Sequence, residues 1–348
     1  MTPERVIASL SIAGVACVLR CGVQPLADKI VTALHCPSVA IDTVLRHVAV
    51  LPIRSEVPCT NLPLYIITTS GSTGTPKQVL ITNDNFWNLF HSGYVLLPEN
   101  SVYIQLCATS FDAHIYEMFP SLCSGTELVL LPPESHMDLI AIAEAIQSRS
   151  VTVAVLVPSL AQVFVEYLDE TNSWHKVQSL RRVIMGGEAV SAAVCRRWST
   201  KVHGISVIDI YGPAECTMVS AYCECAGLAY DEGAAPIGTP IANYTFLIVD
   251  EMYCSVPVGA VGQLYVGGPG VFPGYINQPF LTDNVIVDLS HLHPAMGRAY
   301  RTGDLVRLLP SAEVMFVGRV DFQVLIGFHS SGYLFCGCKF HVFNVFQR

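Results

Sequence analysis

The sequence predicts an α/β protein with layered parallel or mixed sheets, followed by a small antiparallel, β-barrel-like subdomain. Up to residue 234, short β-branched apolar runs alternate with helical stretches, which is typical of parallel sheets covered by helices. Beyond residue 235, glycine and proline become dense and short strands alternate with turns, which favours antiparallel pairing. The chain has 348 residues, enough for more than one hydrophobic core.

The elements are expected in the following order. The first part should hold strands over 15–19, 64–68, 78–81, 102–106, 127–131, 153–157, 182–185 and 206–209. Helices are expected between them over 83–95, 137–149, 158–170 and 190–202. The second part should hold strands over 245–250 and 262–266. We therefore divide the chain into an α/β core over 1–234, a β subdomain over 235–320 and a tail over 321–348.

Composition excludes several classes of function. The net charge of −9 gives no electrostatic reason to expect a nucleic acid or an anionic membrane as partner. No apolar run reaches the roughly 18 residues of a membrane span, and no clear signal peptide precedes the core, so a cytoplasmic location is expected. Thirteen cysteines, an odd number, favour reduced thiols over a disulfide framework. Cys223-x-Cys225, and Cys336-x-Cys338 with His341, lack a second correctly spaced pair, so buried thiols are favoured over a metal site.

A phosphate-binding loop is predicted in Tyr65-Ile-Ile-Thr-Thr-Ser-Gly-Ser-Thr-Gly-Thr-Pro-Lys77. An expected strand ends in a run of hydroxyl residues and glycines, whose backbone can approach a ligand closely. The hydroxyls and turn N–H groups can cradle phosphate oxygens, and Lys77 adds a positive charge. The loop is not a Walker motif, because Pro76 rather than glycine precedes Lys77. A flexible linker is the alternative, but a linker is not expected between two strands.

Further motifs follow this loop in order, and together they resemble the adenylate-forming superfamily. They are Ser110-Phe-Asp-Ala-His-Ile-Tyr-Glu-Met118, Gly186-Gly-Glu188, Asp209-Ile-Tyr-Gly-Pro-Ala-Glu-Cys-Thr217, Gly262-Gln-Leu-Tyr-Val-Gly-Gly-Pro-Gly270 with Gly274-Tyr275, Tyr300-Arg-Thr-Gly-Asp-Leu305, and Gly318-Arg-Val-Asp321. The resemblance spans roughly residues 3 to 326. It is greatest to the adenylation domains of nonribosomal peptide synthetases. The superfamily also includes acyl-CoA synthetases and luciferases.

The resemblance implies an ATP site with Mg²⁺. Tyr211 would stack on adenine, Asp209 would accept a hydrogen bond from its amine, and Asp304 would bind the ribose hydroxyls. Glu215 would hold Mg²⁺, and Asp321 would be a hinge. The implied nucleotide-binding residues are Thr69, Ser70, Gly71, Ser72, Thr73, Gly74, Lys77, Gly187, Asp209, Tyr211, Gly212, Asp304 and Arg319. The implied catalytic residues are Thr73, Lys77 and Glu215.

The same resemblance implies an amino-acid pocket. Asp112 would anchor the α-ammonium group of the substrate, although its position also allows it to cap the following helix. The implied pocket residues are Asp112, Ala113, Tyr116, Val155, Ile184, Gly186, Ile210, Met218 and Val219. Because this set is mostly apolar, we expect a hydrophobic or aromatic substrate side chain.

The implied activity is ATP-dependent formation of an acyl-adenylate from a carboxylic acid, the first step of a ligase reaction in secondary metabolism. A phosphopantetheine thiol on a peptidyl carrier domain would then take the acyl group. Residues 327–348 match nothing in the lid subdomain of the family, whose lysine assists adenylation, and the family's core begins before the part that Met1 matches. We therefore expect a fragment with impaired catalysis. The alternatives are an acyl- or aryl-CoA ligase and a non-catalytic ATP-binding remnant.

Overall fold

The computed structural model describes the chain in several ranges. They are residues 18–20, 25–36, 38–40, 61–69, 76–93, 100–133, 135–225, 227, 233–294 and 296–320. Residues 70–75 of the predicted phosphate loop, the predicted hinge residue Asp321 and the whole tail lie outside these ranges, as do Cys336, Cys338 and His341.

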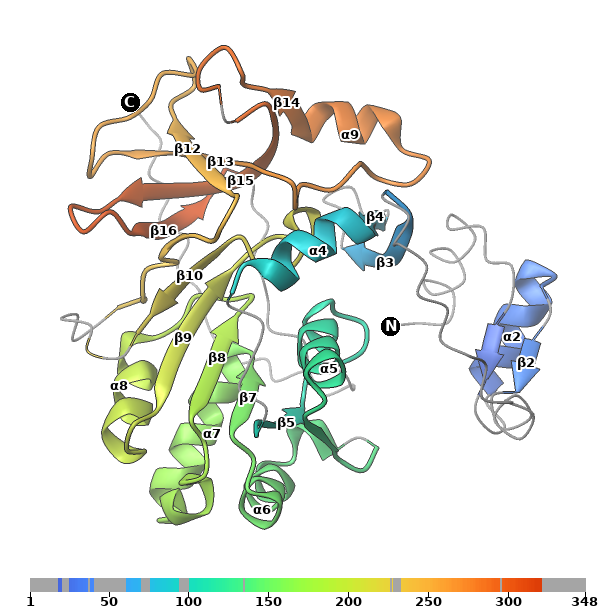
Figure 1. Cartoon of the computed structure of the whole chain (residues 1–348), viewed down its shortest axis with the longest axis vertical. Helices are drawn as coiled ribbons and strands as arrows, with labels where there is room; N and C mark the ends of the chain where they lie inside the picture. Colours follow the sequence, from blue (N-terminus) through green and yellow to red (C-terminus); the bar gives the residue numbers. More distant parts are fainter. Residues whose placement is uncertain are drawn as a thin grey trace, which may run out of the picture.

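A seven-stranded sheet forms the centre of the molecule (Figure 1). Its strand order is β11-β10-β9-β8-β7-β5-β6. The strands are β5 (Val102–Gln105), β6 (Glu127–Leu130), β7 (Val153–Leu156), β8 (Arg182–Gly186), β9 (Ser206–Tyr211), β10 (Ala221–Glu224) and β11 (Thr239–Pro240). The strands from β5 to β9 are parallel, and β10 and β11 are added antiparallel at one edge. The sheet is therefore mixed, as the sequence predicted.

Helices cover both faces of this sheet. They are α5 (Ala113–Ser124), α6 (Leu139–Arg149), α7 (Pro158–Glu170) and α8 (Ala192–Lys201). The chain runs from β5 to its neighbour β6 in one direction, and then from β6 through β7 and β8 to β9 in the other. Because crossovers between parallel strands are right-handed, this reversal places α5 on the face opposite α6, α7 and α8. Such a reversal leaves a crevice at the carboxyl ends of the strands, where ligands bind in open α/β sheets.

Local sequence explains where the helices begin and end. Asp138 precedes α6, and its Oδ1 accepts hydrogen bonds from the N–H groups of Ile140 (3.0 Å) and Ala141 (3.1 Å). Pro158 is the first residue of α7, where its missing N–H costs nothing. Helix α5 ends at Gly125, whose φ of 65° is the left-handed conformation that a C-terminal cap requires.

The second part of the chain is a five-stranded antiparallel sheet. Its strands are β12 (Thr245–Val249), β13 (Val261–Gly267), β14 (Ile286–Asp288), β15 (Arg298–Leu308) and β16 (Val314–Arg319). The order is β12-β13-β15-β14, with β16 also paired to β15. The antiparallel character matches the expectation, while the pairings among the described strands leave the sheet open rather than closed into a barrel. Helix α9 (Pro279–Val285) leads into β14.

Two smaller pieces complete the described structure. Strands β3 (Pro63–Thr69) and β4 (Lys77–Thr82) form an antiparallel hairpin that leads into α4 (Asn83–His91). Thr82 and Asn85 form a capping box at the start of α4. Strands β1 (Val18–Arg20) and β2 (Ser38–Ala40) pair in parallel around α2 (Pro25–Leu34), and this unit stands apart from the rest in Figure 1. No helix among the described residues is long and apolar enough to cross a membrane.

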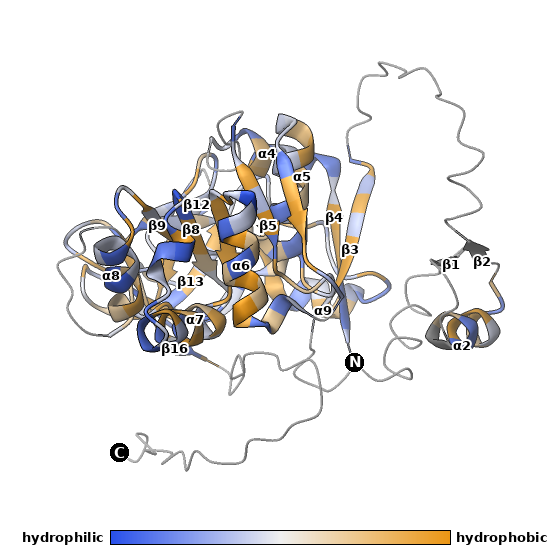
Figure 2. Ribbon diagram, turned by 90° about the horizontal axis from the view of Figure 1, so that it is seen from below, coloured by the Kyte–Doolittle hydropathy of each residue, from blue (hydrophilic) through white to orange (hydrophobic). Residues whose placement is uncertain are grey.

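The two faces of the central sheet belong to different hydrophobic clusters. One cluster joins the sheet to α6, α7 and α8, and includes Phe164 and Trp198. The other joins the opposite face to α4, α5, the β3–β4 hairpin and the five-stranded sheet, and includes Tyr116 and Tyr275. In Figure 2 the orange of apolar residues covers much of the strands around β5 and parts of helices α5 and α6. The predicted substrate residues Val155, Ile184, Met218 and Val219 all belong to the second cluster.

Candidate active site

The carboxyl ends of the parallel strands bring most of the predicted site residues to one edge of the sheet. Asp112 follows β5, Gly186 and Gly187 close β8, and Tyr211 closes β9. A 3₁₀ turn at Ala214–Cys216 then carries Glu215. A Cβ on Gly212 would lie 2.4 Å from the carbonyl oxygen of Met218, so only glycine allows this turn to fold back so closely. Gly187 has φ +86°, and an added Cβ there would meet no atom within 4 Å. The space over Gly187 is therefore open.

Asp112 holds a buried carboxyl oxygen that lacks a partner. It occupies the position before α5, but its side chain makes no capping hydrogen bond, so the capping interpretation is not supported. Its Oδ2 is buried and accepts no hydrogen bond from the residues that the structure describes. Burial, followed by the negative charge of Glu215, raises the pKa of Asp112 to about 6. The buried hydroxyl of Tyr65 on β3 also lacks a partner, and burial and then the Asp112 charge raise its pKa.

Tyr211, Asp304 and Arg319 are joined directly and connect the two sheets. The hydroxyl of Tyr211 donates to Oδ2 of Asp304 over 2.5 Å, and Nη1 of Arg319 lies 2.6 Å from Oδ1. Asp304 and Arg319 face each other in the register of β15 and β16. Burial and then the Asp304 carboxylate raise the pKa of Tyr211. The predicted adenine and ribose residues are thus in contact.

Glu215 and Lys77 are connected through Tyr275. The hydroxyl of Tyr275 donates to Oε1 of Glu215 over 2.6 Å, and this contact is buried. Lys77 Nζ lies 5.4 Å from the centre of the Tyr275 ring, within the range of a cation–π contact. Thr69 pairs with Lys77 across the β3–β4 hairpin, so both flank the predicted phosphate loop. The positions of Ser70, Gly71, Ser72, Thr73 and Gly74 lie outside the described residues.

Asp209 faces away from the substrate residues. It is 3% exposed and pairs in register with Cys223, which belongs to the cluster of α6, α7 and α8. Its neighbour Ile210 packs on the other face, as the alternation along a strand requires. Burial and then the Cys223 thiol raise the pKa of Asp209. Among the described residues, no group of His, Cys, Asp and Glu could hold a metal ion. Cys223 and Cys225 are free and buried.

The structure adds residues that sequence reasoning did not assign to the site. From the sequence, Tyr275 was placed only in a glycine-rich structural stretch. Its contact with Glu215 could not be foreseen, because the two residues are 60 positions apart in the sequence. Glu117 is fully buried, and its carboxylate accepts hydrogen bonds from the N–H groups of Leu106 (2.9 Å) and Cys107 (3.1 Å). It thereby fixes the segment between β5 and Asp112. Glu117 could have been recognised from the sequence, because it is an acid in the middle of an otherwise apolar helix face.

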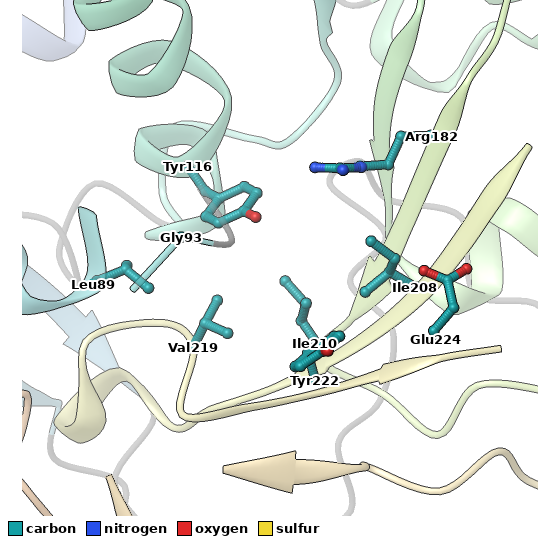
Figure 3. A pocket seen from close by; sticks show the side chains of 9 residues that line it. All are labelled: Leu89, Gly93, Tyr116, Arg182, Ile208, Ile210, Val219, Tyr222 and Glu224. Carbon is teal, nitrogen blue, oxygen red and sulfur yellow. The ribbon is translucent and has the colours of Figure 1, made fainter. Parts of the chain in front are cut away.

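A cavity of about 260 Å³ opens between α4, α5 and the sheet (Figure 3). It is lined by Leu89, Gly93, Tyr116, Arg182, Ile208, Ile210, Val219, Tyr222 and Glu224. Three of these, Tyr116, Ile210 and Val219, are predicted substrate residues. The others, including Arg182, were not predicted. Burial raises the pKa of Tyr116 to about 12, and the positive charge of Arg182 opposes this rise.

Comparison with known proteins identifies the family. A sequence model described as AMP-binding enzyme matches residues 1–276. Malpinin synthetase of Mortierella alpina is 34% identical over 297 residues, which are 85% of this chain and 4% of that protein. Zwittermicin A synthase ZmaJ of Bacillus cereus is 34% identical over 281 residues, 78% of this chain and 52% of that protein. The chain thus spans from a few per cent to about half of the length of these relatives.

Solved structures agree with this assignment. The nonribosomal peptide synthetase FmoA3, bound to alpha-methyl-L-serine-AMP, aligns with a TM-score of 0.83 and 27% identity, over 93% of this chain and 36% of that one. The N-terminal subdomain of NpsA from Klebsiella oxytoca, in complex with 3-hydroxybenzoyl-AMSN, aligns with a TM-score of 0.76 and 25% identity, over 92% of this chain and 78% of that one. The chain therefore belongs to the AMP-binding enzymes, and its relatives include the adenylation domains of nonribosomal peptide synthetases.

Proposed function

We propose that this chain activates an amino acid with ATP as an acyl-adenylate, for loading onto a phosphopantetheine carrier in nonribosomal peptide biosynthesis. Family membership supports ATP-dependent activation of an acid. We infer an amino-acid substrate from Asp112 at the crevice of the sheet. Its Oδ2 is buried and has no hydrogen-bond partner among the described residues. A buried carboxylate is stable only with a cationic or hydrogen-bonding partner, and an α-ammonium group supplies both.

The nucleotide residues fit ATP with Mg²⁺. Oε1 of Glu215 accepts from Tyr275, which leaves Oε2 for a cation. Asp304 binds Tyr211 and Arg319 through different oxygens, and a carboxylate with about four acceptor positions can bind ribose hydroxyls as well. Gly187 follows Gly186, which pairs with Ile210 next to Tyr211, and the open space over Gly187 would leave room for an adenine stacked on Tyr211. When bound, Mg²⁺ would neutralise phosphate charge and help the pyrophosphate to leave.

The chain's own residues would then orient the reactants. Asp112 holds the amino end of the substrate, so that its carboxylate points towards the nucleotide edge. One carboxylate oxygen attacks the α-phosphorus, the bond from this phosphorus to the bridging oxygen breaks, and pyrophosphate leaves. Lys77 and Thr73 would bind the phosphates of the leaving group, while Arg319 would act on the ribose or phosphate end.

The substrate side chain should be largely hydrophobic. The predicted pocket residues are mostly apolar, and the cavity beside them adds Leu89 and Ile208. In a relative, PA1221, adenylation and PCP domains occur in one protein. We propose a peptidyl carrier domain as the partner of this chain also.

Calorimetry and pyrophosphate exchange test this proposal. The chain should bind ATP·Mg²⁺, and a hydrophobic amino acid should stimulate exchange of pyrophosphate into ATP. Amino-acid affinity should rise with pH through about 6, because Asp112 must lose its proton before it pairs with the ammonium group. Asp112→Asn should weaken amino-acid binding by roughly 30-fold or more and leave ATP binding unchanged.

Three outcomes would contradict the proposal. ATP binding without exchange for any acid would favour a non-catalytic remnant. Unchanged acid binding in Asp112→Asn would favour an acyl- or aryl-CoA ligase. Pyrophosphate exchange stimulated only by small polar amino acids would contradict a hydrophobic substrate side chain.

A further inference from the structure

The far end of the substrate cavity holds a cation that none of the predicted pocket residues supplies. Arg182 is the first residue of β8, half-buried, and it lines the cavity. It lies on the same face of β8 as Ile184 and Gly186, because alternate residues of a strand share a face. Figure 3 shows its guanidinium extending from β8 towards the side of the cavity formed by Tyr116 on α5.

No described acid neutralises this guanidinium. No ion pair of Arg182 with a described carboxylate lies within 4.0 Å, although four other pairs do form among the described residues. Among the described residues that line the cavity, the single acid is Glu224. It is exposed, and its oxygens already accept hydrogen bonds from the hydroxyl of Ser206 (2.7 Å) and the N–H of Val207 (3.1 Å). Toward the described residues, Arg182 therefore keeps unused donors directed into a largely apolar cavity.

The cavity continues from the place where the amino group of a substrate would bind. Tyr116 lies one helical turn beyond Asp112, so both project from the same side of α5. Tyr116, Ile210 and Val219 are shared by the cavity and the predicted substrate wall. From Gly186 to Arg182 the strand runs roughly 13 Å. A short side chain would not span this distance, whereas a ring with a para substituent or a long chain would approach Arg182.

We propose that this site selects an amino acid with a long, hydrophobic side-chain stem that ends in an oxygen acceptor, best a carboxylate, bound by Arg182. This inference rests on the proposed function and narrows its substrate class. A guanidinium presents a planar fork of donors that matches a carboxylate, and such charge-assisted bonds are stronger than neutral ones. The nine predicted residues alone would favour an entirely hydrophobic side chain, because none of them carries a positive charge.

Stable mimics of the acyl-adenylate test this without requiring turnover. Four 5′-O-(N-aminoacyl)sulfamoyl adenosines would be titrated calorimetrically into the whole chain: the glycyl, 4-methylphenylalanyl, 4-carbamoylphenylalanyl and 4-carboxyphenylalanyl compounds. The three aromatic ligands have nearly the same shape and differ in the terminal group. We expect the carboxyl compound to bind at least about tenfold more tightly than the methyl compound, with the carbamoyl compound between them.

Two variants assign the preference to Arg182. Arg182→Met keeps a long side-chain stem without charge. It should abolish or reverse the order of affinities of the three aromatic compounds, while affinity for the glycyl compound stays unchanged. Arg182→Lys should keep part of the preference, because the charge remains but the fork does not.

The outcomes separate this inference from the proposed function. Equal or tighter binding of the methyl compound to the native chain, or a carboxyl preference that survives in Arg182→Met, overturns the role of Arg182. Binding of the glycyl compound in those cases would leave the proposed function intact. Failure of all four compounds to bind would overturn the proposed function, and this inference with it.

Discussion

The two faces of the central sheet are built from the same strands but serve different purposes. On the face of α6, α7 and α8, large side chains such as Phe164 and Trp198 are almost fully buried in an aliphatic and aromatic cluster. On the face of α4 and α5, the structure holds a cavity, the partnerless carboxyl oxygen of Asp112 and the buried Glu117. Both faces bury a carboxyl group, Asp209 on the first and Glu117 on the second, but the cavity lies on the second face.

Strand β8 shows the difference within five residues. Val183 and Met185 are fully buried against the helices of the first face. Arg182 and Ile184 point to the other face, where one lines the cavity and the other packs among the predicted substrate residues. Because side chains alternate along a strand, one segment can support the fold and form the site independently. Substitutions on the two faces should therefore affect different measurements.

The largest effect on stability is expected on the packed face. Trp198→Ala removes a fully buried indole and should lower the free energy of unfolding by about 3–5 kcal/mol, as measured by urea denaturation. Trp87→Ala is the matched control, because Trp87 is 59% exposed on α4 and should change stability by less than about 1 kcal/mol. Similar losses in the two variants would contradict the division between a packed and an exposed position.

Glu117 should make the stability of the ligand-binding face depend on pH. Burial raises its pKa from 4.5 to about 7, against the opposing effect of the Leu106 and Cys107 amides. Between pH 4.5 and 7, Glu117 is therefore protonated in the folded chain and ionised in the unfolded chain. The stabilisation that Glu117 gives the folded chain is complete below about pH 4.5 and is lost as pH rises through 7, which lowers the free energy of unfolding by about 3 kcal/mol.

Glu117→Gln should flatten this part of the pH dependence, as followed by denaturation at several pH values. Some slope should remain, because the pKa of Asp112 is raised in the same direction. Glu170→Gln, at an exposed position of α7, should leave the slope unchanged. An unaltered slope in Glu117→Gln would show that this carboxyl is not the titrating group.

Tyr275 should set the requirement for Mg²⁺. Tyr275→Phe keeps the ring beside Lys77 but removes the hydroxyl that orients Glu215. The Mg²⁺ concentration needed for half-maximal ATP binding should rise about tenfold, as groups that orient a metal ligand typically contribute this much. Calorimetry with ATP alone should show no difference. Tyr253→Phe, an exposed tyrosine, serves as control, and equal Mg²⁺ dependence in both variants would exclude the role.

The smallest effect is expected at the surface. Arg149 pairs with Glu127, but their side chains are 59% and 46% exposed. Glu127→Gln should lower the free energy of unfolding by less than about 1 kcal/mol, because solvent and salt screen exposed pairs. A loss comparable to that of Trp198→Ala would mean that this edge of the sheet is more important to the fold than its burial indicates.

Much of the fold could be predicted because its elements are locally encoded. The expected strands at 64–68, 102–106 and 153–157 and the helix at 158–170 agree with β3, β5, β7 and α7 to within about two residues. Helices α2 and α9 and strand β14 were not predicted. Strand β15 was recognised only as a motif, because Gly303, with φ +78°, interrupts its regular pattern.

Candidate site residues could be identified from the sequence where they belong to a motif, and less so where they are marked only by tertiary contacts. The motifs that contain Asp112, Tyr211, Glu215 and Asp304 led to residues that the structure gathers at the sheet edge or joins across it. Tyr275 and Arg182 could not be assigned in this way, because their importance depends on which distant residues they face. The functional roles given to all of these residues, as to Asp209, Thr73 and Asp321, remain predictions.

The bond between Tyr211 and Asp304 also bears on the kinetics of nucleotide entry. It joins the two sheets at the edge where a nucleotide would arrive. A ligand that had to break this bond would meet an activation barrier on association. A nucleotide that bound at Asp304 while leaving this bond intact would associate without separation of the two sheets.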